Sequence, residues 1–322
     1  PSWLLTASLA VVVGAGLLTK FSFPVYFGIA ALALLIVERR LSHPRAIVAA
    51  VGALFIVWGG YFFTQLPRFF TGFAAVLRHS AEGHGAYFLG EVRYTGWWYY
   101  FPVVLLLKTP IPFLILAGAG AVRAVRSRPH RLFVIIAVAT LLAVIPSRMN
   151  LGVRHILPIY VPLAALAAAG TLHLWRSRAR WVVPVLGAWL LVNSVAAHPD
   201  YLPWMNAFAG KQPERIVLDS NFDWGQDVLR LRDTCRAMRI PAIGVELAGT
   251  VDLRRIGMPP TRPIDRYRAT PGWYAVSEGF VLPAQVMEPS AYRWLTDHRS
   301  FVRVGRTIRL YHVAPGGPPG GK

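Results

Sequence analysis

The sequence predicts a polytopic α-helical membrane protein with a small α/β domain after its last membrane span. The hydrophobic content of 55% and the mean hydropathy of +0.44 exceed what a soluble globule usually has. Long apolar runs recur before residue 198, whereas charges of both signs and short β-rich runs follow it. We therefore expect a transmembrane domain, 1–197, a soluble domain, 198–314, and a flexible tail, 315–322.

Apolar runs define seven candidate spans, because about 20 apolar residues cross a bilayer and fewer suffice when flanking groups snorkel. They lie near 3–19, 22–37, 46–66, 101–122, 132–146, 156–174 and 181–197. The first, second and fifth are short, so one of them can be a half-helix or lie partly inside protein. The stretch 67–100 then forms a long loop.

Basic residues predict the orientation of the spans. Ten arginines fall in the loops after the second, fourth and sixth spans: Arg39, Arg40, Arg45, Arg123, Arg126, Arg128, Arg131, Arg176, Arg178 and Arg180. The opposite loops hold fewer basic residues over more chain, and aromatic clusters such as Trp97–Phe101 fit an interfacial belt there. The loop 67–100 and the C-terminal domain are thus expected on the outer face.

A formal charge of +19 is also typical of proteins that bind nucleic acid. Of the 34 Lys and Arg, 17 precede residue 198, against only three acids there, Glu38, Glu82 and Glu91. A basic excess between apolar runs indicates topology and anionic lipid before nucleic acid. The single cysteine, Cys235, excludes an internal disulfide.

The soluble part reads as strands at 215–219, 242–247, 272–277 and 307–313 with one clear helix. That helix follows "DSNFDWGQD", 219–227, whose acids are spaced like an EF-hand loop. Trp224 and Arg230 occupy the places of its glycine and bidentate glutamate, which argues against calcium. A capping box with Asp223 as N-cap and Gln226 at the third helical position is favoured. A sugar or acceptor site and calcium remain as alternatives.

Three basic residues lie near or within the apolar runs: Lys20, Lys108 and Arg154. Lys108 lies inside "FPVVLLLKTPIPFLIL", where a charge facing lipid costs about 2.5–3.5 kcal/mol, so it faces an anion or polar cavity or snorkels to the interface. Lys20 either caps a helix or meets a lipid headgroup, or it contacts a substrate phosphate. Arg154 stands at the mouth of the sixth span, where arginine can bind phosphate bidentately, and His155 beside it can donate or bind metal.

The loop 67–100 holds a possible general-base or metal set, Glu82, His84 and Glu91, although their spacing fits no defined metal motif and a solvated loop explains them equally well. The chain has no P-loop, no Gly-x-Ser-x-Gly, no His-Glu-x-x-His and no Cys pair. Basic groups around an outward cavity therefore indicate a lipid phosphate as the substrate.

Three ordered motifs carry a resemblance: "GHGAYFLGEVRYTGWWYYFPVVLLLKTPIPFLIL", "MNLGVRHILPIYVPLAALAA" and "LDSNFDWGQDVLRLRD". Over roughly residues 5–312 the chain resembles the C-terminal portion of bacterial glycosyltransferase family 39, relatives of protein O-mannosyltransferases and the lipid A aminoarabinose transferase. The resemblance implies a multi-pass enzyme of the bacterial inner membrane, of the C superfamily, that moves a sugar from a polyprenyl-phosphate donor to a protein, lipid or glycan acceptor on the outer face.

By position, the resemblance assigns Lys20, Lys108 and Arg154 to the donor phosphate, and makes His84, Glu91 and His155 candidates for sugar, acceptor or metal binding. Gly85 replaces the family's usual proline. The family's catalytic acid lies in a first outer loop that would precede residue 1, so the resemblance implies that this stretch alone is inactive. A divalent metal is a possible cofactor. No nucleic-acid partner is expected.

Two other functions fit the sequence. A flippase for lipid-linked sugars also needs basic residues in a cavity, but it moves its substrate without breaking the glycosidic bond. A membrane scaffold with an outer binding domain explains the topology, yet it leaves Lys108 without a purpose.

Overall fold

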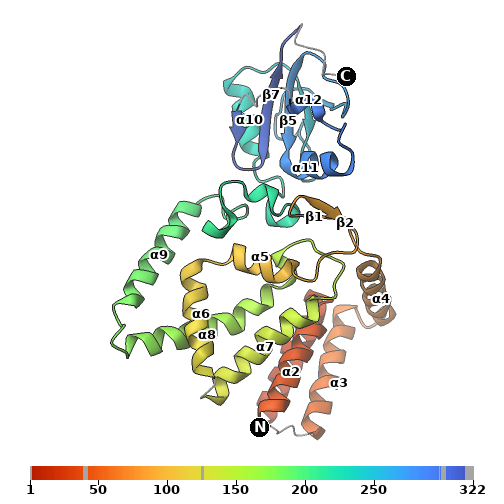
Figure 1. Cartoon of the computed structure of the whole chain (residues 1–322). Coiled ribbons are helices and arrows are strands. Elements are labelled where there is room, and N and C mark those ends of the chain that lie inside the picture. Colours follow the sequence, from red (N-terminus) through yellow and green to blue (C-terminus); the bar gives the residue numbers. More distant parts are fainter. Residues whose placement is uncertain (1, 39–42, 125–126, 297, 299–301, 316–322) are drawn as a thin grey trace. The chain divides into compact units, whose positions relative to one another are not determined.

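The computed structural model describes residues 2–38, 43–124, 127–296, 298 and 302–315. The chain is mostly helical with a small sheet, which confirms the coarse form of the predicted fold class (Figure 1). It divides into two compact units. Unit 1 comprises Pro1–Gly83, Pro112–Arg148 and Ile156–Leu186; unit 2 comprises His84–Ile111, Met149–His155 and Gly187–Lys322. The predicted tail lies outside the described residues except for Pro315.

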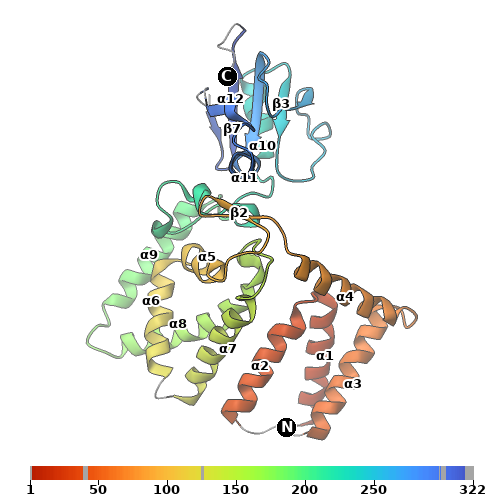
Figure 2. The same ribbon diagram turned by 45° about the vertical axis from the view of Figure 1, so that its right-hand side comes forward.

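Unit 1 is built from helices (Figure 2). They are α1 (Trp3–Thr19), α2 (Phe23–Glu38), α3 (His43–Gly60), α4 (Leu66–Glu82), most of α6 (Ile111–Ala124), α7 (Arg128–Val144), α8 (Tyr160–Trp175) after a short 3-10 turn (Leu157–Ile159), and the start of α9 (Val182–Ala197). Glycines let α6 and α8 touch: a Cβ on Gly120 would lie 1.9 Å from the Leu166 carbonyl oxygen, and one on Gly170 would lie 2.0 Å from that of Leu116. Such close backbone contact is typical of helices that pack in membranes.

The predicted spans all coincide with helices, but two were drawn wrongly. The helix in the predicted span 46–66 is α3, which ends at Gly60 and not at residue 66. The run 101–122 is broken into α5 (Tyr100–Lys108) and α6, because Pro110 has no N–H to continue the helix and pushes Thr109 into an extended conformation. Within the described residues, only Leu157–Trp175 is long and apolar enough to cross a membrane unaided, and α5 with α6 would count as a second if they form one broken span.

The stretch 67–100, which we predicted as a long loop, contains a helix and a hairpin. Its first half is α4, which starts with Pro67 in the first turn and buries Phe69 against Phe21, with ring centroids 5.6 Å apart. Its second half contains an antiparallel hairpin, β1 (Ala86–Phe88) and β2 (Glu91–Arg93). The hairpin belongs to unit 2.

Unit 2 contains a five-stranded sheet in the order β4-β3-β5-β7-β6. The strands are β3 (Ile243–Glu246), β4 (Thr261–Pro263), β5 (Gly272–Ser277), β6 (Val302–Val304) and β7 (Ile308–Val313). β3 runs parallel to β4 and β5, and β7 runs antiparallel to β5 and β6. Helix α10 (Val228–Ala237) covers one face, and α11 (Glu278–Met287) and α12 (Arg293–Thr296) cover the other (Figure 1).

Three predicted strands, 242–247, 272–277 and 307–313, are confirmed as β3, β5 and β7. The predicted strand 215–219 is wrong. It lies between two 3-10 turns, Pro213–Arg215 and Asp219–Asn221, and only Val217 makes an isolated bridge, to Phe88. The unit around the sheet is also larger than the predicted soluble domain, since it takes in 84–111, 149–155 and 187–197 as well.

The stretch "DSNFDWGQD" begins the helix differently from our prediction. α10 starts at Val228 with Asp227 as N-cap, so Asp223 is not the cap. Instead Asp223 Oδ1 accepts a hydrogen bond of 2.8 Å from the Gly225 amide, and Gln226 Oε1 accepts one of 2.8 Å from the Trp224 amide. Burial raises the pKa of the Asp223 carboxyl. The Asp223 side chain thus stabilises a turn, because an aspartate carboxylate readily accepts a hydrogen bond from the backbone amide two residues later.

Candidate functional site

A buried polar cluster in unit 2 is centred on Asn221, which is 1% exposed. Its Oδ1 accepts a 2.9 Å hydrogen bond from the Val153 amide, and its Nδ2 donates a 2.9 Å bond to the Tyr100 hydroxyl. Its carbonyl accepts from Lys108 Nζ. One residue therefore joins all three segments on which the resemblance rests, and we call these four residues the Asn221 cluster.

Lys108 is tied entirely to backbone oxygens. Its Nζ donates to the carbonyls of Leu202 at 2.5 Å and Trp204 at 3.1 Å as well as to that of Asn221. An ammonium group has three donors, so none is left for a phosphate in this arrangement. Lys108 therefore neither contacts a phosphate nor extends to the membrane interface in this structure. It is a positioning residue that holds residues 202–221 against the end of α5.

Asn206 completes that attachment and was not foreseen. Because Pro110 has no N–H, the Leu106 carbonyl lacks its helical donor, and Asn206 Nδ2 supplies one at 2.6 Å. The same group also donates to the Thr109 carbonyl at 2.7 Å. The Lys-Thr-Pro sequence signals the broken helix end, but nothing local to it indicates which distant side chain satisfies the carbonyls.

Gly152 lets the Gly-Val-Arg-His segment reach the cluster. Its φ is +139°, and a Cβ there would lie 2.4 Å from Ser220 Oγ and 3.1 Å from Asn221 Oδ1. Ser220 Oγ in turn donates to the Leu151 carbonyl. The glycine is thus required by both backbone conformation and space.

Replacing Gly152 with alanine is expected to cost about 2–4 kcal/mol, the sum of overpacking and left-handed strain. Gly210→Ala is the matched control, since Gly210 has φ +66° but nothing within 4 Å of an added Cβ. Thermal unfolding of both variants should show the larger loss for Gly152→Ala. Equal losses would mean that the close contact with Ser220 carries no energy.

Arg154 presents its charge beside an exposed aromatic ring. Its guanidinium carbon lies 4.9 Å from the centroid of Trp224, which is 56% exposed, and Trp224 Nε1 donates to the Ser220 carbonyl at 3.3 Å. Among the described residues Arg154 has no carboxylate within ion-pair distance, and its buried Nε has no hydrogen-bond partner. The group is therefore available to an external anion.

Arg93 provides a natural contrast. It lies over Trp97 at 5.2 Å in the same way, but Glu91 pairs with it at 2.5 Å. The predicted ligand Glu91 is thereby an exposed partner of an arginine rather than a member of a ligand set. His84 is also exposed, and its Nδ1 bonds the Gly85 carbonyl at 2.8 Å.

His155 is half-buried in the 3-10 turn Val153–His155, next to Arg154. In the part of the chain that the structure describes, no three His, Cys, Asp or Glu side chains gather as a metal site would require. His84, Glu91 and His155 thus remain separate candidates for sugar or acceptor contacts.

Asp219 is the first acid of the stretch that is spaced like an EF-hand loop. It is exposed, and it adopts φ +58°, which only glycine, asparagine and aspartate visit with any frequency. Its carbonyl accepts from the amides of Phe222 at 2.8 Å and Asp223 at 3.1 Å, which holds the conformation. The exposed carboxylate lies two residues before Asn221 of the cluster.

Lys20 lies in unit 1, where it caps the C-terminal end of α1 with its backbone amide, as one of the sequence alternatives proposed. Its side chain lines a cavity of about 520 Å³. Thr19, Ser22, Tyr26 and Thr140 contribute polar groups, and the remaining lining is apolar or aromatic: Phe23, Phe27, Ala30, Phe133, Ile136, Pro158, Val161 and Pro162. None of the described residues that line the cavity carries a carboxylate, so an amphiphilic anion fits its chemistry.

Comparisons of the chain with protein-family models, curated proteins and solved structures found no match. Function is therefore inferred from the residues and their geometry alone. Two arrangements carry that inference: the Lys20 cavity of unit 1 and the unpaired Arg154 that the Asn221 cluster of unit 2 positions.

Proposed function

We propose that the chain belongs to a membrane glycosyltransferase that takes a sugar from a polyprenyl-phosphate donor and passes it to an acceptor on the outer face of a bacterial inner membrane. The observation that carries the proposal is the Lys20 cavity, because a lone cation in a mostly apolar cavity suits a phosphate attached to an isoprenyl chain. Small pockets for soluble anions have polar linings instead.

Exposed apolar side chains on the helices support the membrane part of the proposal. Leu4, Val122, Leu142, Val161 and Leu191 are between 60% and 77% exposed. Surfaces of this kind mark contact with a membrane or another protein. Among the described residues, five shorter apolar helices accompany Leu157–Trp175 and the bent pair α5 and α6, and on this proposal they would lie in the bilayer.

The chemistry of the transfer assigns roles to the cations. The departing polyprenyl phosphate gains negative charge as the glycosidic bond breaks, and cations at its oxygens stabilise that charge. Within unit 1, Lys20 can supply a contact of this kind, and within unit 2, Arg154 can, whereas Lys108 acts by positioning. Deprotonation of the acceptor needs a carboxylate as general base.

The phosphate contacts are tested with farnesyl phosphate, a short isoprenyl phosphate, added to the protein in lipid nanodiscs. Lys20→Ala and Arg154→Ala should each weaken binding about tenfold, which is roughly 1.4 kcal/mol and in the range of a charge-assisted hydrogen bond. Arg93→Ala should leave binding unchanged, because Glu91 already neutralises that arginine.

Farnesol and inorganic phosphate are the ligand controls. Weak binding of both is expected, since the site needs chain and phosphate together. Equal affinities of Lys20→Ala, Arg154→Ala and Arg93→Ala for farnesyl phosphate would contradict the assignment.

A further inference from the structure

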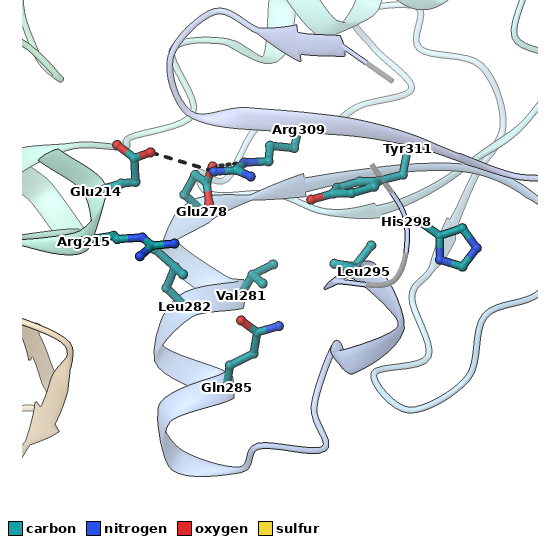
Figure 3. A pocket seen from close by; sticks show the side chains of 10 residues that line it. All are labelled: Glu214, Arg215, Glu278, Val281, Leu282, Gln285, Leu295, His298, Arg309 and Tyr311. Carbon is teal, nitrogen blue, oxygen red and sulfur yellow. Dashed lines mark hydrogen bonds and ion pairs between the residues drawn. The ribbon is translucent and has the colours of Figure 1, made fainter. Parts of the chain in front are cut away.

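A second pocket, of about 470 Å³, lies wholly within unit 2, beside the 3-10 turn Pro213–Arg215, helix α11 and strand β7 (Figure 3). Its volume is in the range of small-molecule sites, roughly 300–1,000 Å³. Its polar lining comprises Glu214, Arg215, Glu278, Gln285, His298, Arg309 and Tyr311. None of these residues belongs to the Asn221 cluster or to the Lys20 cavity.

Glu214 holds an unused acceptor in this pocket. The residue is 4% exposed, and its Oε1 pairs with Arg303 at 3.5 Å and Arg309 at 3.8 Å. Its Oε2 is buried and has no hydrogen-bond partner among the described residues. A buried carboxylate oxygen without a donor costs about 1–3 kcal/mol or more, so a ligand that supplies a donor gains that energy.

Glu278 lies on the same wall, where Arg309 Nε donates to its Oε1 (Figure 3). Burial raises the pKa of the Glu278 carboxyl, and the nearby Arg309 opposes that effect. The lining holds two carboxylates, two arginines, Arg215 and Arg309, and one histidine, His298, and Arg303 pairs with Glu214 as well, so charged groups of both signs border the pocket.

The charged groups of both signs in the lining determine which class of ligand fits the pocket. An anion such as a phosphate would approach two buried carboxylates, and an amine would approach two guanidinium groups. A neutral ligand with many hydroxyls avoids both conflicts, because each hydroxyl can donate to Glu214 Oε2 and accept from an arginine or from Gln285. Val281, Leu282 and Tyr311 supply apolar surface for the C–H faces of a sugar ring.

We propose that this pocket is a binding site for a neutral saccharide, with Glu214 Oε2 as the acceptor for a ligand hydroxyl. The inference rests on the pocket alone and not on the proposed transferase activity. A saccharide held there would be a glycan that the protein recognises apart from its lipid-linked donor.

The test uses the whole chain in lipid nanodiscs, because maltoside detergents carry a sugar headgroup. Maltose, chitobiose and mannobiose are titrated by saturation-transfer NMR and calorimetry. At least one disaccharide should bind, and Glu214→Gln should weaken its binding tenfold or more. Glu288→Gln, an exposed glutamate of the same unit, should bind like wild type.

Arg215→Ala provides a second variant whose folding is not at risk, because Arg215 is exposed, and it should also weaken binding. Thermal unfolding checks that Glu214→Gln is folded. Failure of all three disaccharides to bind at millimolar concentration would overturn the proposal. So would unchanged affinity in both Glu214→Gln and Arg215→Ala, or tighter binding of lysine methyl ester at the same pocket. These outcomes leave the farnesyl phosphate result untouched, so the two proposals fail separately.

Discussion

Replacing Asp227 with alanine is expected to destabilise unit 2 by about 3–5 kcal/mol, the usual cost of leaving buried charged partners unmatched. Asp227 is fully buried. Its Oδ2 accepts from the amides of Arg306 at 2.8 Å and Thr307 at 3.0 Å and from the Thr307 hydroxyl at 2.9 Å, and its Oδ1 pairs with Arg230 at 2.6 Å. The carboxylate thus fixes the turn between β6 and β7 to the start of α10.

Asp227→Asn should lose much of the same energy. Every partner of the carboxylate is a donor, so an amide would place its own NH₂ against one of them. Asp233→Ala is the matched control, because Asp233 is an exposed residue of the same helix that pairs with Arg232. The free energy of unfolding, measured by chemical denaturation, should change by less than about 0.5 kcal/mol for that control. Similar losses in Asp227→Ala and Asp233→Ala would show that the buried network is not stabilising.

Replacing Asn221 with alanine is the second change with a large expected effect, a loss of about 2–6 kcal/mol in the free energy of unfolding. The Val153 amide and the Tyr100 hydroxyl would each lose a buried partner, at about 1–3 kcal/mol apiece. The variant should also bind farnesyl phosphate more weakly, because the segment that carries Arg154 would no longer be held.

Gln212→Ala, at an exposed position of the same unit, is the control for both measurements. Tyr100→Phe separates the two bonds of Asn221, since it removes only the one to the hydroxyl and should cost less than Asn221→Ala. A stable Asn221→Ala variant with wild-type affinity would show that the cluster does not position Arg154.

Local patterns were sufficient for much of the fold. Apolar length predicted the helices near 3–19, 132–146 and 156–174, and β-rich runs predicted β3, β5 and β7, because each of these elements depends on its own residues. The broken span 101–122 was within reach of the sequence as well, since Pro110 alone explains the break. The strand expected at 215–219 failed because its hydrogen bonds are directed to β1 and to turns rather than to the sheet.

The site depended on pairs that no local pattern shows. Asn221 meets Val153 and Tyr100 across 68 and 121 residues of chain. The sequence marked Lys108 correctly as a residue that must face something polar, but its partners are carbonyls and not a phosphate. Glu214 gave no signal, and Asp227 was noted only as an acid of the EF-hand-like stretch, because the sequence does not show whether a carboxylate is buried.

The most direct test of the proposed transfer follows a polyprenyl-phosphate sugar labelled in the sugar, added to vesicles that contain the protein. We expect release of polyprenyl phosphate together with transfer of the label to an acceptor. The transfer rate should fall at least about tenfold in Arg154→Ala and should be unchanged in Arg93→Ala. Label that crosses the bilayer with its bond to phosphate intact would identify a transporter instead and contradict the account.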